Sequence, residues 1–234
     1  MIYISPAQKF DRITELMTEA QIENGLQFWK PEDIILVTNF HYKYKGIRSM
    51  IVDKDIWTPI KYAEVYNNVW RFTKFFMLVY LMEHGVITDD LTWVHDFDAF
   101  QLTDLDMPPL DRDLGLVEYG FRSKINLGNT FFKPSALDVF KLLNRKMLEW
   151  KLDEEETLVR LQAENIENIN SRFRKLNITY NVGSRFVNRN VNFAEKPVKI
   201  AHFMVWMPQL RETFKPYIPE KLYNLLNEKF TDLH

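Results

Sequence analysis

The pattern of apolar and polar positions predicts strands that alternate with amphipathic helices over the first hundred residues. Residues 33–40 form a continuous, β-branched apolar run, as expected for a buried strand. Apolar residues recur at helical spacing over 10–26 and again from about 61 to 83. Strands are expected over residues 2–5, 33–40, 47–52 and 91–97. Because strands joined by helices form parallel crossovers, we predict an α/β fold with a mainly parallel sheet that binds ligands beyond the carboxyl ends of its strands.

Beyond residue 100 the predicted elements are shorter and their order changes. A loop rich in proline and aspartate covers 102–113, and Asn126-Leu-Gly-Asn129 indicates a turn whose backbone can approach a ligand closely. We expect short strands at 114–119 and 130–133, and helices at 134–150, 153–168 and 219–230. No linker-like change of composition separates these parts, so we predict one domain over residues 1–234.

The strand predicted over 91–97 leads into two carboxylates, Asp96 and Asp98. Residues i and i+2 of an extended chain point to the same side, so the two carboxylates repel each other unless a cation lies between them. The alternative is an ordinary solvated strand end. Ser5 and Asn39 also fall at the ends of predicted strands, where a parallel sheet binds its ligands.

The amino-acid composition limits the class of protein and the kinds of metal ligand that are available. Of the 234 residues, 46% are hydrophobic and 15% aromatic, which is ample for a buried core. There is no cysteine, so any metal must be held by oxygen or imidazole ligands. The N-terminus lacks the pattern of a signal peptide, and the most apolar segment, 72–82, carries Lys74 and is shorter than a membrane span. We therefore expect a cytoplasmic protein without a membrane span.

Charge is unevenly distributed along the chain, although the net charge is only −2. Residues 89–118 hold nine acidic residues and one basic residue, whereas 172–199 hold seven basic residues and one acidic residue. An acidic segment favours a cation and a basic segment favours phosphate, so a metal-bridged phosphate ligand would use both. The alternative is two solvated faces that compensate each other.

His202 is a second candidate ligand. It ends a short β-like run at 198–202 and lies far along the chain from the acidic pair. A lone histidine among apolar residues is commonly a hydrogen-bonded core residue, which is the alternative here. Together with Asp96 and Asp98, however, its imidazole completes a ligand set that suits Mn²⁺ and accepts Mg²⁺.

Four features, in their order along the chain, resemble the metal-dependent nucleotide-sugar glycosyltransferases with the GT-A fold. They are the opening strand at 2–5, the Asp96-Phe97-Asp98 motif, the segment 126–132 and the late segment Lys199-Ile-Ala-His-Phe203. The last two are similar to motifs of glycogenin- and galactosyltransferase-like members. The chain then departs from that subfamily, because it lacks the glycine and the lysine-proline-tryptophan tail after His202. The subfamily therefore stays open.

The resemblance implies a GT-A-like mixed sheet flanked by helices, with a nucleotide-binding part over about 1–100 and a part for the donor sugar and acceptor over about 101–234. It implies a nucleoside-diphosphate sugar as donor, and a carbohydrate or small molecule as acceptor. It assigns the metal to Asp96, Asp98 and His202, and the donor or acceptor to Ser5, Asn39, Asn126, Gly128 and Lys199.

The implied chemistry is attack of an acceptor hydroxyl on the anomeric carbon of the activated sugar. An inverting enzyme also needs a carboxylate base, for which Asp98, Asp153 and Glu155 are candidates. The acidic run 153–156 also suits a helix N-terminus, which is the structural alternative. Base, donor, acceptor, stereochemistry and oligomeric state stay open.

Other functions compete with this interpretation. Basic residues alternate with aromatic ones over 172–199, which would suit a phage-type enzyme that transfers a hexose or pentose to a hydroxymethylated DNA base. Such an enzyme would act in a virus-infected host cell, and a carbohydrate-modifying one in a bacterium. A metal-dependent phosphohydrolase with Asp96 as nucleophile is a further alternative, as is a non-catalytic domain that binds nucleotide sugars.

Overall fold

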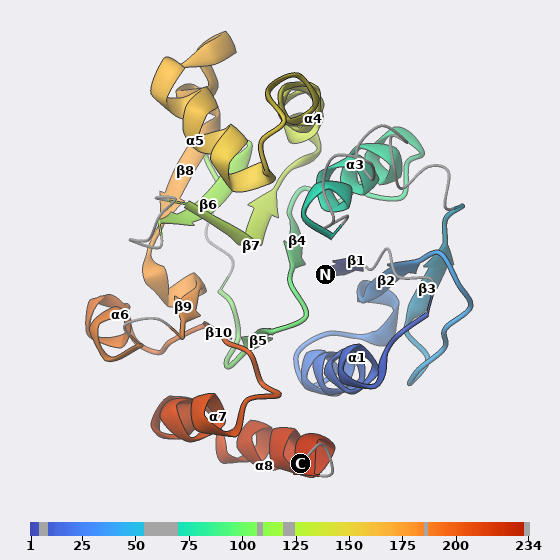
Figure 1. Ribbon diagram of the computed structural model, residues 1–234, viewed down its shortest axis with the longest axis vertical. Coiled ribbons are helices and arrows are strands. Elements are labelled where there is room, and N and C mark those ends of the chain that lie inside the picture. Colours follow the sequence, from blue (N-terminus) through green and yellow to red (C-terminus); the bar gives the residue numbers. More distant parts are fainter. Residues whose placement is uncertain (5–8, 54–69, 107–109, 119–124, 185–186, 232–234) are drawn as a thin grey trace.

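The computed structural model describes residues 1–4, 9–53, 70–106, 110–118, 125–184 and 187–231. In these residues a central sheet of seven strands has the order β3-β2-β1-β4-β7-β6-β8 (Figure 1). Its strands are β1 (Ile2–Ile4), β2 (Ile35–Thr38), β3 (Arg48–Ile51), β4 (Thr92–His95), β6 (Leu114–Glu118), β7 (Ile125–Phe132) and β8 (Phe173–Leu176). The helices are α1 (Arg12–Gly25), α3 (Trp70–Glu83), α4 (Leu137–Trp150), α5 (Glu154–Glu164), α6 (Val187–Phe193), α7 (Pro208–Phe214) and α8 (Glu220–Phe230).

The strand pairing confirms the predicted mixed, mostly parallel sheet. Strand β1 pairs in parallel with β2 and β4, β2 pairs in parallel with β3, and β6 pairs in parallel with β8. Strand β7 lies antiparallel to both β4 and β6. The reversal at β7 ends the parallel series directly beside β4, the strand that leads into Asp96.

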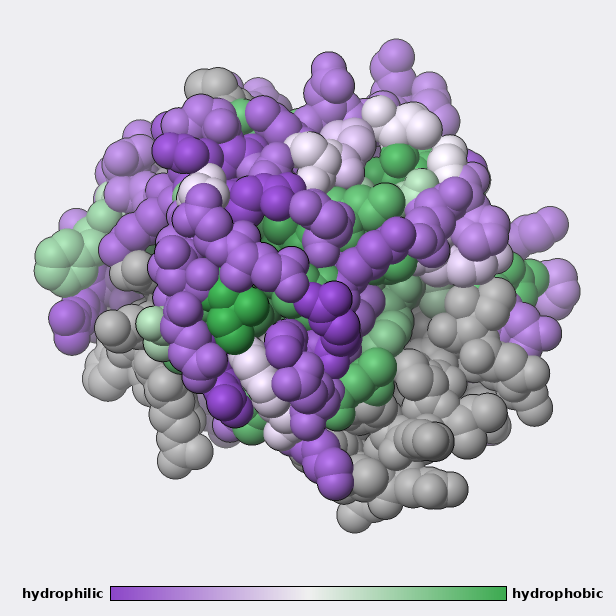
Figure 2. Space-filling view, turned by 90° about the horizontal axis from the view of Figure 1, so that it is seen from above, coloured by the Kyte–Doolittle hydropathy of each residue, from purple (hydrophilic) through white to green (hydrophobic). Residues whose placement is uncertain are grey.

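Alternation along the strands explains why helices cover both faces of the sheet. In β1, Ile2 packs into the core cluster that α3 and α4 cover, whereas Tyr3 packs against Ile22 of α1 on the other side. The predicted α1 is confirmed, and Asp11 caps its N-terminus by accepting a hydrogen bond from the Thr14 amide at 2.7 Å. The outer face seen from above is mainly hydrophilic, with apolar side chains visible in its middle (Figure 2).

A second, three-stranded sheet consists of β5 (Ala99–Gln101), β10 (Ile200–His202) and β9 (Val182–Gly183). Strand β10 pairs antiparallel with β5, which places His202 opposite Ala99. It pairs in parallel with β9, which places His202 opposite Gly183. This small sheet therefore brings a late segment of the chain next to the residues that follow β4.

Several predicted elements differ in the structure. The turn predicted at 126–129 is wrong, because these residues belong to β7. Asparagine and glycine suggested the turn, whereas in the structure β6 and β7 stay paired across a register shift, with Leu116 opposite Thr130 and Val117 opposite Asn126. The helix predicted over 153–168 ends at Glu164, where Asn165 adopts a left-handed conformation. The start of the helix predicted from residue 61 and the strand end at Ser5 lie outside the described residues. Within the described part of the chain, no helix is long and apolar enough to span a membrane.

Candidate metal centre

Asp96, Asp98 and His202 converge at the carboxyl end of β4. One potential ligand atom from each lies within 4.8 Å of the others. The Asp96 amide donates to the Gly128 carbonyl at 2.9 Å, and the Ala99 amide donates back to the Asp96 carbonyl at 3.1 Å, which turns the chain sharply between the two aspartates. The strand predicted over 91–97 ends at His95, so this turn, and not the predicted extended geometry, brings the two carboxylates together. The Phe203 amide donates to the Asp98 carbonyl at 2.9 Å and ties the histidine segment to the same turn. The three predicted metal ligands are therefore adjacent.

The charges of this cluster are coupled. Asp98 Oδ1 lies 3.1 Å from His202 Nε2, and their side chains are 21% and 13% exposed. Burial by itself raises the pKa of Asp98, but the adjacent imidazole outweighs burial and the pKa lies below its ordinary value. Burial lowers the pKa of His202, and the Asp98 charge outweighs this effect and raises it. Two carboxylates and one imidazole form an oxygen-rich donor set that fits a divalent cation.

Because Gly128 has no side chain, Asp96 and His202 can approach each other beside the backbone of β7. A Cβ atom built on Gly128 would lie 2.8 Å from both Asp96 Oδ2 and Asn126 Oδ1, and closer still to His202 Cε1. A side chain at this position would therefore collide with two of the three candidate ligands. The backbone of β7 can form one wall of the centre only because residue 128 is glycine.

Lys74 connects the cluster to the helical side of the molecule, and sequence reasoning did not assign it a role. Its side chain is 11% exposed, and its Nζ lies 3.0 Å from Asp96 Oδ1, 3.3 Å from Glu154 Oε1 and 2.9 Å from the Leu127 carbonyl oxygen. Burial lowers the pKa of Lys74, but the Asp96 and Glu154 carboxyls outweigh burial and raise it. The only signal in the sequence was a lysine within an otherwise apolar helix.

Glu154 is the buried partner of Lys74. Burial raises its pKa to about 8, against the opposing effect of the Lys74 charge, and the nearby Asp96 and Glu155 charges add to the increase. Among the described residues its Oε2 atom has no hydrogen-bond partner. Lys74 therefore bridges Asp96 and Glu154, and burial raises the pKa of Glu154 although the lysine opposes the increase.

Three asparagines surround His202. Asn181 Oδ1 lies 2.9 Å from His202 Nδ1, and the Asn129 amide nitrogen donates to the same oxygen at 3.0 Å. The Asn181 amide nitrogen donates to Asn126 Oδ1 at 2.7 Å. The Asn126 amide nitrogen in turn donates to Glu155 Oε1 at 3.1 Å. Asn126 was predicted from the sequence, whereas Asn129 and Asn181 were not, because no local pattern distinguishes them.

The remaining predicted site residues have other surroundings. Asp153 caps α5, and its carboxylate accepts the Glu156 amide at 2.8 Å. Lys199 donates to the Asp104 carbonyl at 2.9 Å and forms an ion pair with Asp106. Asn39 directly follows β2, as predicted for a strand end. Ser5 lies outside the described residues.

Half-buried aromatic rings lie beside the cluster, at the ends of β1 and β2. Phe10 packs edge-to-face against Phe40 and Tyr42 at centroid distances of 4.8 and 4.9 Å. It also lies 6.3 Å from Phe97, the residue between the two aspartates. These rings offer a flat ligand a surface for stacking.

The basic and acidic segments neutralise each other in the structure. Arg172 forms ion pairs with Asp113 and Asp138, and Arg174 with Asp111 at 3.5 Å. Lys199 and Asp106 add a similar link. These three basic residues pair with aspartates, in line with the compensating alternative, and the site for a phosphate ligand stays a prediction.

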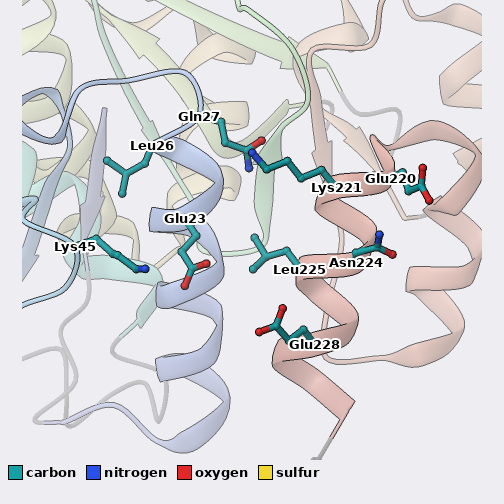
Figure 3. A pocket seen from close by; sticks show the side chains of 9 residues that line it. All are labelled: Glu23, Leu26, Gln27, Lys45, Glu220, Lys221, Asn224, Leu225 and Glu228. Carbon is teal, nitrogen blue, oxygen red and sulfur yellow. The ribbon is translucent and has the colours of Figure 1, made fainter.

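A separate groove of about 680 Å³ lies between α1 and α8 (Figure 3). Its lining mixes acidic, basic and apolar side chains, among them Glu23, Lys221 and Leu225. It contains none of the predicted site residues.

Comparison with known proteins shows the fold. No protein-family model and no curated protein matches this chain. Among solved structures, GlyE of Streptococcus pneumoniae TIGR4 has a TM-score of 0.61 at 14% identity, covering 99% of this chain and 64% of GlyE. A glycosyltransferase involved in glycosylation of the major capsid of PBCV-1 has a TM-score of 0.56 at 14% identity, covering 86% and 92%. The galactosyltransferase LgtC, in complex with donor and acceptor sugar analogues, has a TM-score of 0.52 at 12% identity, covering 96% and 99%. These likenesses confirm the expected GT-A-like α/β fold.

Proposed function

We propose that this chain is a metal-dependent glycosyltransferase that moves a sugar from a nucleoside-diphosphate sugar to an acceptor hydroxyl. The observation that carries the proposal is the convergence of Asp96, Asp98 and His202 within 4.8 Å at the carboxyl end of a parallel strand. Glycosyltransferases with the same fold support it, among them the galactosyltransferase with donor and acceptor sugar analogues. The cation would be Mn²⁺ or Mg²⁺.

In the proposed reaction, the acceptor oxygen forms a bond to the anomeric carbon while the bond from that carbon to the diphosphate oxygen breaks. The bound cation would supply positive charge to the departing diphosphate. Lys74 would add a buried positive charge beside Asp96 and hold that carboxylate in place. The acceptor proton requires a base. Asp98 would be bound to the cation, which leaves Asp153 and Glu155 as our candidates. Of these, Asp153 is already engaged as a helix cap.

The donor would lie across the ends of β1, β2 and β4. We propose that residues up to about 100 bind the nucleotide, with Ser5 and Asn39 near it and the Phe10 cluster available to stack on its base. Residues after 100 would hold the sugar and the acceptor, with Asn126 and Gly128 facing the reacting end. Lys199 forms an ion pair with Asp106 and could bind a diphosphate only after breaking it. Of the predicted donor-binding residues, we therefore consider Lys199 the weakest candidate.

The acceptor in this proposal is a carbohydrate or a small molecule. A DNA acceptor is not favoured, because Arg172, Arg174 and Lys199 are paired with aspartates rather than directed at a ligand. A phosphohydrolase with Asp96 as nucleophile is not favoured either, because Lys74 holds one oxygen of that carboxylate.

A thermal-shift screen of nucleotide sugars with and without Mn²⁺ tests the proposal. We expect one donor to raise the melting temperature by about 5 °C at saturation, and only when Mn²⁺ is present. Asp98→Asn should abolish the Mn²⁺-dependent part, whereas Asp111→Asn, which removes the partner of Arg174 outside the cluster, should retain it. If no nucleotide sugar stabilises the protein with Mn²⁺, or if Asp98→Asn behaves like the wild type, the proposal is wrong.

A further inference from the structure

We propose that Asn181 is a positioning residue that accepts the Nδ1 proton of His202 and so keeps Nε2, the nitrogen that faces Asp98, as the atom that binds the cation. Its own orientation is imposed by two groups that can only donate hydrogen bonds, the indole of Trp93 and the backbone amide of Gly128. The inference rests on the proposed function in one respect, since the cation is the one that the glycosyltransferase would use.

The first line of evidence begins at Trp93. An indole N–H can donate a hydrogen bond and cannot accept one. Trp93 Nε1 lies 3.1 Å from Asn129 Oδ1, so the Asn129 side chain must present its oxygen to Trp93 and its NH₂ group to Asn181. The atom of Asn181 that receives this NH₂ group at 3.0 Å is therefore its oxygen, Oδ1.

The second line of evidence begins at the opposite end and does not depend on the first. The Gly128 backbone amide, which also can only donate, lies 3.0 Å from Asn126 Oδ1. Asn126 therefore presents its oxygen at this point, and its NH₂ group donates to the Glu155 carboxylate at 3.1 Å. The Asn181 atom that lies 2.7 Å from Asn126 Oδ1 must then be its NH₂ group. This leaves the oxygen of Asn181 on the side of His202.

Both lines give Asn181 the same orientation, and the burial of the network preserves it. Asn129 and Asn181 are 0% exposed and Trp93 is 1% exposed, so water has no access that would satisfy a rotated amide. Rotation of the Asn181 amide would bring NH₂ against NH₂ at Asn129 and oxygen against oxygen at Asn126. It would break three hydrogen bonds at once in a buried setting, where an unpaired polar group is costly.

The consequence falls on His202. Because Asn181 Oδ1 is an acceptor 2.9 Å from His202 Nδ1, that nitrogen must carry a proton. Nε2 lies 3.1 Å from Asp98 Oδ1 and donates to this carboxylate when no cation is bound. A cation between the two would replace the Nε2 proton, and Nδ1 would keep its own proton on Asn181. A histidine that binds a metal through one nitrogen is oriented by the hydrogen bond that its other nitrogen makes. Asn181, the residue directly before β9, thus orients the ligand that β10 supplies.

The test has two readouts, neither of which is catalysis. The first is the ¹H–¹⁵N NMR signal of His202 Nδ1, recorded without metal and again with diamagnetic Mg²⁺. The second is Mn²⁺ affinity measured by electron paramagnetic resonance. Wild-type protein should keep a proton on Nδ1 in both states and lose the Nε2 proton only when Mg²⁺ is bound. Asn181→Ala should lose the Nδ1 signal and weaken Mn²⁺ binding by about 10–100-fold.

Asn181→Asp should keep the Nδ1 proton and bind Mn²⁺ at least ten times more tightly than Asn181→Ala, because its carboxylate still accepts from Nδ1. Asn24→Ala is the matched control, since Asn24 is also a buried asparagine, 3% exposed, but donates to the Gln101 carbonyl. It should leave both readouts unchanged. A wild type without a proton on Nδ1, or an Asn181→Ala variant that matches the wild type in both readouts, overturns the inference. If the wild type binds no Mn²⁺, the proposed function fails, and the Nδ1 signal of the metal-free protein alone decides the role of Asn181.

Discussion

At the scale of the residue, the missing side chain of Gly128 is as important to the candidate centre as the ligands. We predict that Gly128→Ala lowers Mn²⁺ affinity by more than about tenfold, because the new methyl group would lie 2.8 Å from Asp96 Oδ2 and collide with His202. Gly85→Ala is the control. Gly85 has a φ of +64° and open space around it, so an alanine there strains the backbone by about 1 kcal/mol without reaching the centre. Equal Mn²⁺ affinities of the two variants, by electron paramagnetic resonance, would contradict the steric argument.

The raised pKa of Glu154 leads to a pH-dependent stability. Between its unfolded value of 4.5 and its folded value of about 8, the folded protein holds a proton that the unfolded chain has released. Raising the pH through this window therefore removes stability, by on the order of 5 kcal/mol over the whole window at about 1.4 kcal/mol per pKa unit. Glu154→Gln should remove this part of the pH dependence of the unfolding free energy, whereas Glu156→Gln, at an exposed position, should retain it. Urea unfolding at pH 5.5 and 8.5 measures the difference, and equal slopes for Glu154→Gln and the wild type would refute the assignment.

Local sequence identified some site residues and not others, for physical reasons. Asp96 and Asp98 could be found because an i, i+2 acidic pair after an apolar strand is a short-range pattern. His202 could be proposed because its chemistry matched that pair. Lys74 and Asn181 have no such pattern, since their partners lie far away in the chain and meet them only through the packing of α3 and of the small sheet.

At the scale of the element, helix α8 closes the core beneath the small sheet. Leu226 is 0% exposed and belongs to the same apolar cluster as Phe203, the residue after His202. Leu225 on the same helix is only partly buried: it packs against this cluster and also lines the groove next to α1 (Figure 3). We predict that Leu226→Ala lowers the free energy of unfolding by about 2–5 kcal/mol. Leu225→Ala, the same change on the groove side, should cost less than about 1.5 kcal/mol. Urea unfolding distinguishes them, and equal costs would contradict the described packing of α8.

At this scale, elements whose apolar residues recur at regular spacing could be predicted. Elements that form only by pairing with strands distant in the sequence could not. Helices α1, α4 and α8 follow from apolar residues at helical spacing, and β2 follows from a continuous apolar run. The residues of β7 were predicted as a turn followed by a strand, because asparagine and glycine are disfavoured in strands. What makes Asn126 to Asn129 extended is pairing with β4 and β6, which no local pattern reveals.

At the scale of the whole molecule, the hydrophobic pattern and the order of the motifs were enough to predict the fold class. Which charged residues pair with each other could be seen only in the structure. The sequence places a basic segment a long way from an acidic one, and either separate faces or mutual pairing would have been consistent with that. The structure shows mutual pairing, because the parallel pairing of β6 with β8 brings the loop before β6 against the residues of β8. Arg172 and Arg174 then meet Asp113 and Asp111 across neighbouring strands.

This pairing predicts that the protein binds duplex DNA weakly. A basic surface binds DNA by releasing counterions from phosphates, and arginines already paired with carboxylates contribute less to that release. We therefore expect a dissociation constant weaker than about 100 µM at low salt, measured by fluorescence anisotropy of a labelled duplex. The double variant with Asp111→Asn and Asp113→Asn removes a partner from each of Arg174 and Arg172, and should bind DNA more tightly and with a steeper salt dependence. Micromolar, strongly salt-dependent binding by the wild type would instead show that other basic residues form a nucleic-acid surface, and would return DNA to the list of acceptors.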